Sequence, residues 1–138
     1  MTKDEIYAFL NANPVCFLAT GEGNQPRVRG MMLFRADEQG IIFHTGKGKD
    51  LVAQIEKNPT VELCAFDQKN FVQVRVSGTA EFNDDIALKD EIVARHEFLK
   101  PVVEQYGYDA LVVFSVKGKN AAVWTMATNM EPKTVIDL

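Results

Sequence analysis

Several features that would define a function class are scarce in this 138-residue chain. No apolar run approaches the ~20 residues of a membrane-spanning helix, and the N-terminus lacks the apolar segment of a signal peptide. The only cysteines, Cys16 and Cys64, lie in apolar strand-like segments, so buried thiols are expected rather than a disulfide. We therefore expect a cytoplasmic protein without a membrane segment.

Positive charge and metal-binding residues are also limited. Lys and Arg number 15 against 19 Asp and Glu, which gives a formal net charge of −4 at pH 7. A nucleic-acid-binding protein would normally carry a basic stripe, so no nucleic-acid partner is expected. The two histidines, His44 and His96, have no metal-ligand spacing with each other or with the cysteines, and no metal site is predicted.

The pattern of hydrophobic residues predicts one mainly β domain of the α+β class over residues 1–138. Helices are expected over 2–13, 50–57 and 84–97, with a short helical segment through Tyr106. Short turns between strands predict antiparallel pairing and closure into a barrel, with the tail from residue 128 along the surface. Seven strands are expected, the last two as a hairpin, at 15–20, 27–36, 41–45, 60–67, 72–82, 110–116 and 120–127.

The stretch 26–58 is the most informative part of the chain. Residues 27–49 hold five cations and two acids, a small basic region that suits one compact anion such as a phosphate group. Thr45-Gly46-Lys47-Gly48-Lys49 leads into a helix N-terminus, which is either a phosphate site or an ordinary solvated turn. Arg29 joins this site only if its strand lies beside the lysine loop, and a hairpin of 27–36 with 41–45 would place it there.

No residue constellation in the chain is typical of strong acid–base chemistry. The glycine and lysine spacing around Gly46 fits neither a nucleotide-hydrolase phosphate loop nor a dinucleotide-binding fingerprint. Ser77 and Ser115 lack the context of a serine nucleophile. A cofactor that carries the chemistry is therefore favoured.

Three segments in register match a known family: residues 29–49 (RGMMLFRADEQGIIFHTGKGK), the helix ending at residues 55–59 (IEKNP), and residues 73–78 (QVRVSG). The chain resembles the FMN-binding split barrels related to pyridoxamine 5'-phosphate oxidase, and among them the short nitroimidazole-reductase-like proteins. The resemblance implies a six- to seven-stranded antiparallel split β-barrel with flanking helices. It also implies a homodimer with FMN at the subunit interface.

The resemblance further implies a set of cofactor-binding residues. An arginine and one of two rival lysines would contact the phosphate, and four backbone positions would follow the isoalloxazine ring. A strand-end pair, a glutamine on the pyrimidine side and an aromatic residue, from either subunit, would complete the site. The phosphate contacts are Arg29 and either Lys49 or Lys47, and the backbone positions along the ring are Gly30, Met31, Met32 and Leu33. The strand-end pair is His44 and Thr45, the glutamine is Gln73 and the aromatic residue is Trp124.

Two departures from the family bear on function. The arginine- and tryptophan-bearing C-terminal segment of the longer oxidases has no counterpart here, so oxidation of vitamin B6 is not expected. Phe34 occupies the place of the family's usual lysine after the strand.

The leading hypothesis is an FMN-dependent oxidoreductase with a reduced donor such as NAD(P)H and a small flat acceptor. His44 is either a proton donor to that acceptor or simply a strand-end histidine. The alternatives are a non-catalytic FMN-binding carrier or sensor, a haem-handling barrel and an interaction domain without a cofactor.

Overall fold

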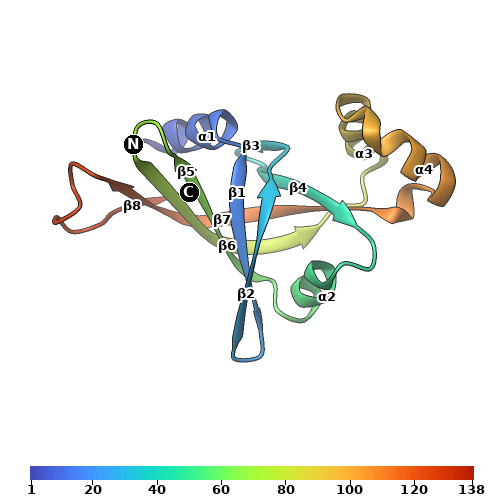
Figure 1. Ribbon diagram of the computed structural model, residues 1–138, viewed down its shortest axis with the longest axis horizontal. Coiled ribbons are helices and arrows are strands. Elements are labelled where there is room, and N and C mark those ends of the chain that lie inside the picture. Colours follow the sequence, from blue (N-terminus) through green and yellow to red (C-terminus); the bar gives the residue numbers. More distant parts are fainter.

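The computed structural model describes residues 1–138 as an eight-stranded antiparallel sheet with four α-helices (Figure 1). The strand order is β2-β1-β5-β6-β7-β4-β3, and β8 also pairs with β7. The helices are α1 (Lys3–Ala12), α2 (Asp50–Lys57), α3 (Ile86–Arg95) and α4 (Lys100–Tyr106), with 3-10 turns η1 (Glu97–Leu99) and η2 (Tyr108–Ala110). The strands are β1 (Val15–Glu22), β2 (Gln25–Met32), β3 (Arg35–Asp37), β4 (Gly40–Gly46), β5 (Thr60–Asp67), β6 (Val72–Phe82), β7 (Leu111–Thr125) and β8 (Thr134–Asp137).

The two ends of the main strand order, β2 and β3, follow each other in the chain and are separated only by Leu33 and Phe34. At this step the chain changes partner: Leu33 N–H donates to Pro14 O (2.9 Å), and Phe34 N–H donates to Ile42 O (2.7 Å). The sheet therefore curls back on itself. This arrangement confirms the predicted α+β class and the antiparallel split barrel.

The main core lies inside the curled sheet and follows the period-two pattern of the strands. In β1, Cys16 and Leu18 are fully buried, whereas Val15 and Phe17 face outward. Helix α1 begins with a capping box, in which Thr2 and Glu5 bond reciprocally. The apolar face of this helix packs into the main core cluster of 19 residues.

A smaller cluster of six residues lies where α3 packs against β4 and β7. Leu88 and Ile92 of α3 contact it from the helix side, and Phe34 joins it at the step between β2 and β3. Figure 1 shows α3 and α4 together at one end of the molecule, away from the β7–β8 connection. None of the helices is both long and apolar enough to span a membrane.

The predicted strand 27–36 is wrong as a single element. Residues 25–32 pair with β1, and only Arg35–Asp37 pairs with β4. Residues 31–34 are all apolar, and Leu33 and Phe34 are both buried, so an unbroken apolar run crosses the step and the sequence gives no sign that the hydrogen-bonding partner changes.

The predicted final hairpin is also wrong. Strand β7 runs without a turn from Leu111 to Thr125, and the step at Gly118 is a bulge against β6. A Cβ added at Gly78 would lie 2.3 Å from Lys117 O, so the glycine allows the two backbones to approach. The tail predicted along the surface contains β8, which pairs with residues 120–123 of β7.

Candidate functional site

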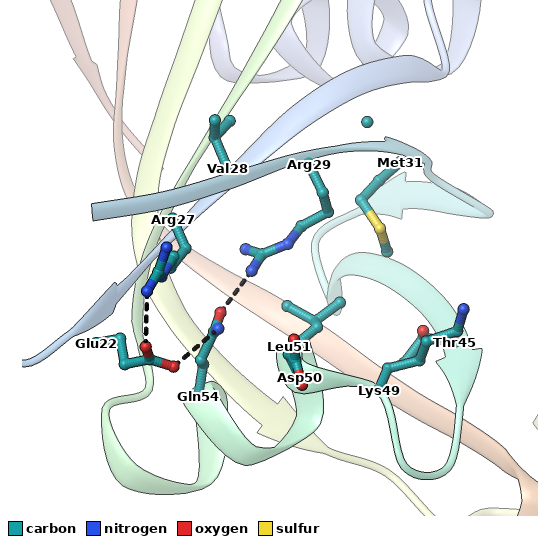
Figure 2. Close-up of a pocket in the computed structure, with 11 residues that line it drawn as sticks. Glu22, Arg27, Val28, Arg29, Met31, Thr45, Lys49, Asp50, Leu51 and Gln54 are labelled. Carbon is teal, nitrogen blue, oxygen red and sulfur yellow. Dashed lines mark hydrogen bonds and ion pairs between the residues drawn. The ribbon is translucent and has the colours of Figure 1, made fainter. Parts of the chain in front are cut away.

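A cavity of about 590 Å³ lies between β2, the end of β4 and the N-terminal half of α2 (Figure 2). We call it the arginine cavity. Both neighbouring strands and the helix contribute charged or polar side chains to it, and its volume is typical of sites for small molecules and cofactors. It is lined by Glu22, Arg27, Val28, Arg29, Gly30, Met31, Thr45, Lys49, Asp50, Leu51 and Gln54.

Arg29 is the central cation of this cavity. Its guanidinium points from β2 toward Gln54 of α2 and donates to Gln54 Oε1, to Thr20 Oγ1 (2.9 Å) and to Leu18 O (3.2 Å). All three acceptors are uncharged, and no carboxylate lies within ion-pair distance. Burial lowers the pKa of Arg29, an effect that Asp50 partly opposes, yet an arginine remains protonated in proteins. The cavity thus holds a half-buried positive charge without a paired anion.

Gln54 fixes the position of this arginine. It is only 5% exposed and accepts a hydrogen bond from Thr20 Oγ1 (2.7 Å), while its amide nitrogen donates to Glu22 (3.2 Å). Glu22 also pairs with Arg27 at 3.1 Å, and this contact is the main reason that the pKa of Glu22 is lowered. Sequence reasoning missed Gln54. Its signal was a polar residue at a core-facing position of an amphipathic helix.

The structure separates the two rival lysines. Lys49 is the N-cap residue of α2 and lines the arginine cavity together with Thr45. Lys47 lines a different cavity of about 570 Å³, which it shares with residues near α4 such as Tyr106 and Asp109. The expected convergence of Arg29 with both lysines therefore holds for Lys49 only. The reason is local: Lys47 N–H donates to Ala110 O (2.9 Å), which directs this part of the loop toward η2.

A second cavity of about 330 Å³ adjoins the first, and we call it the histidine cavity. Three residues line both cavities, and the others come from β2, β4 and the segment after α3. The ring centroids of His44 and His96 lie 5.5 Å apart. Burial lowers the pKa of His44, and the charge of His96 lowers it further. The lining residues are Gly30, Met31, Met32, His44, Thr45, His96 and Phe98.

Sequence analysis did not place His96 or Phe98 at a site. They lie about 50 residues from His44 in the chain, and no motif links them. Only the packing of α3 against β4 brings His96 beside His44. No local sequence signal could have shown this contact.

Other predicted site residues lie outside both cavities. Gln73 and Trp124 are directly opposite each other on β6 and β7, on the outward face of the sheet. The indole of Trp124 donates to Asn129 Oδ1 (2.8 Å). Leu33 is 4% exposed and its side chain belongs to the main core. Within a single chain, Gln73 and Trp124 therefore lie apart from Arg29.

The same outward face is unusually apolar. Phe17 at its centre is 55% exposed and pairs with Gly30 on one side and Cys64 on the other. The exposed apolar side chains around it come from three adjacent strands, β2, β1 and β5. They are Val15, Phe17, Val28, Met32 and Phe66. We call these five residues the apolar face.

Comparison with known proteins points to one family. Residues 2–130 match the sequence profile of the family described as pyridoxamine 5'-phosphate oxidase. A curated pyridoxine/pyridoxamine 5'-phosphate oxidase from Edwardsiella ictaluri (strain 93-146) is 32% identical over 66 residues. That match covers 48% of this chain and only 30% of the relative, so most of the curated protein has no matched counterpart here.

Solved structures show the same fold. A NimC/NimA family protein from Clostridium acetobutylicum has a TM-score of 0.79 at 23% identity, and the match covers 98% of this chain and 92% of that protein. A protein from Nostoc punctiforme PCC 73102, described as pyridoxamine 5'-phosphate oxidase-related and FMN binding, has a TM-score of 0.66 at 17% identity. That match covers 96% of this chain and 87% of the other. At these identities the likeness concerns the fold alone.

Proposed function

This chain belongs to the pyridoxamine 5'-phosphate oxidase family, and from that membership we propose that it is an FMN-dependent oxidoreductase. It would move electrons between a reduced donor such as NAD(P)H and a small flat acceptor. One observation carries the proposal: Arg29, half-buried and without a carboxylate partner, lines the same cavity as Lys49. A buried charge is normally paired, and the phosphate of FMN would supply the missing anion.

The charges that line the arginine cavity fit this ligand. Glu22 and Arg27 neutralise each other in their ion pair. Arg29 and Lys49 remain against the single carboxylate of Asp50, so the cavity carries one net positive charge. The N-terminus of α2 adds its partial positive charge on the same side. Phosphate binding is therefore favoured on the α2 side of the cavity.

The residues present also fit the rest of the cofactor. The volume of about 590 Å³ lies within the usual range for cofactor sites, and the exposed backbone at Gly30 has no side chain to obstruct a flat ring. Bound FMN would supply the electron-transfer chemistry that the side chains of this chain lack. The family relative from Nostoc punctiforme, described as FMN binding, supports this choice of cofactor.

The proposal includes a homodimer. The apolar face is larger than scattered surface residues would explain, and it adjoins the cavities through Gly30 and Met32. Two copies packed through this face would cover Phe17 and Val28. They would also bring Gln73 and Trp124 of each copy toward the flavin of the other. Sedimentation at micromolar concentration tests this part, and a monomer would remove the shared site.

His44 is the proposed proton donor to the acceptor. Its lowered pKa keeps the imidazole neutral at pH 7, so its N–H can donate a hydrogen bond to the acceptor, and the protonated form, whose share grows as the pH falls, can transfer a proton. The chain would act in the cytoplasm, in line with its two free thiols, Cys16 and Cys64.

The test is the absorption spectrum of freshly purified protein, followed by anaerobic addition of NADH or NADPH. A flavin spectrum that bleaches with the donor and recovers with a quinone or nitroaromatic acceptor is expected. A flavin spectrum without turnover toward any acceptor would favour a carrier or sensor. No flavin after purification and no uptake of added FMN would contradict the proposal, and haem titration would then test the haem-handling alternative.

A further inference from the structure

We propose that the histidine cavity binds the acceptor, and that this acceptor is a small planar anion, such as a nitroaromatic or quinoid carboxylate, held by His44 and His96. This inference rests on the proposed function in placing the flavin in the adjoining arginine cavity. It adds the chemical class of the second ligand and a residue, His96, that recognises it. The observations that carry it are the pairing of the rings, their free nitrogens and the lining of the cavity.

The two imidazoles lack partners within the chain. Their ring centroids lie 5.5 Å apart at an interplanar angle of 46°, and His96 also contacts the rings of Phe34 and Phe98. Neither imidazole forms a hydrogen bond or an ion pair with another side chain or with the backbone. Each imidazole therefore keeps a ring N–H free to donate to a carboxylate oxygen of a ligand.

The charges around the pair favour an anion. His44 and His96 are the only titratable residues that line the cavity, so no carboxylate is present to stabilise their protonated forms. On the α3–η1 side, Arg95 lies over the ring of Phe34, and Glu97 is 3.4 Å from Lys100. On the β2 side, Gly30, Met31 and Met32 carry no charge. An incoming anion therefore meets no carboxylate inside the cavity.

The remaining walls favour a flat, apolar body for the ligand. Phe98 is largely exposed at the cavity, and Met31 and Met32 can make sulfur–aromatic contacts. The volume of about 330 Å³ is at the lower end of the range for small-molecule sites, and this suits one or two rings rather than a dinucleotide. Benzoate is a suitable probe because it has one ring and one carboxylate.

The experiment follows the imidazole NMR signals of the full-length protein as benzoate is added, with and without FMN. We expect saturable shifts of the NMR signals of both histidines, stronger binding as the pH falls through the lowered pKa of His44, and simultaneous binding of FMN. The His96→Gln variant should bind benzoate about tenfold more weakly, as expected for the loss of one charge-assisted hydrogen bond, while its affinity for FMN is unchanged. Glu97→Gln is the matched control on the same segment and should retain wild-type affinity for benzoate.

Three results would overturn the inference: no shift of the histidine signals, equal affinity in His96→Gln and the wild type, or displacement of FMN by benzoate, which would show one shared site. These results differ from failure of the proposed function, which is the absence of FMN binding. If FMN does not bind, the flavin-free titration still decides whether the histidine cavity takes the anion.

Discussion

The arginine cavity holds its main cation through hydrogen bonds, whereas the histidine cavity leaves its two imidazoles without any. In the first, three uncharged acceptors fix Arg29, and Gln54 joins two strands to α2. In the second, His44 and His96 contact each other, and His96 also contacts the rings of Phe34 and Phe98. A preorganised cation suits a cofactor that stays bound, and unbonded donors suit a ligand that enters and leaves.

The sharpest test of this comparison is the removal of the fixed cation. Arg29→Ala should weaken FMN binding by about 1–3 kcal/mol, because a charge-assisted contact with the phosphate is lost. Isothermal titration with FMN measures it. Arg95→Ala is the matched control, since Arg95 lies over the ring of Phe34, does not line the arginine cavity and should leave FMN affinity unchanged. Equal affinity in the two variants would place the phosphate elsewhere.

A second test removes the support instead of the cation. Gln54→Leu keeps the approximate size of the side chain but leaves Thr20 and Arg29 without one acceptor. The expected loss is about 1–2 kcal/mol of unfolding free energy, the usual effect of an unsatisfied buried polar group. FMN affinity should fall less than in Arg29→Ala. Chemical denaturation measures the stability, and an unchanged midpoint would show that the network does not stabilise the fold.

The two lysines provide a smaller, paired test. Lys49→Ala should weaken FMN binding by about 1 kcal/mol, because its ammonium is exposed and partly screened by solvent. Lys47→Ala should leave the affinity unchanged, since Lys47 lines a different cavity. Fluorescence quenching of FMN is sensitive enough for both. A larger effect at Lys47 would reverse the assignment of the phosphate lysine.

The smallest effect is expected from pH. Folding lowers the pKa of His44 from its ordinary value of 6.5. Below pH 6.5 the unfolded chain therefore binds more protons at this residue than the folded protein does. This contribution to stability is complete above pH 6.5 and is lost as the pH drops through the lowered pKa. Unfolding of wild type and His44→Gln, compared across this range, should diverge at low pH. Parallel curves would show that His44 titrates as in the unfolded chain.

The arginine cavity was largely predictable because its parts lie close together in the sequence. Arg29, Thr45 and Lys49 fall within 21 residues of one another, and the helix N-terminus follows directly. The predicted position of Arg29 nevertheless depended on a hairpin of 27–36 with 41–45, of which only residues from Arg35 onward pair with β4. Arg29 lies beside the loop because β2 pairs with β1 and α2 packs across both, and not because β2 pairs with β4.

The long strand β7 shows why the ends of helices and strands were harder to predict than their type. Lys117-Gly118-Lys119 has the composition of a turn, and the apolar residues on both sides suit two short strands. Gly78 on the opposite strand leaves room for the backbone of β7 to pass, so a bulge forms where a turn was expected. This outcome depends on a residue about 40 positions away.

The amino-acid sequence by itself determined the α+β class, the alternation of buried and exposed strand residues, the capping box of α1 and the basic stretch near α2. These features depend on neighbours a few residues apart, whose spacing the sequence records directly. Only the tertiary structure decided that Lys49 rather than Lys47 lies with Arg29, that His96 meets His44, and that Gln73 and Trp124 face outward. Each of these depends on how distant strands and helices pack, because backbone pairing and core burial fix those positions independently of sequence distance.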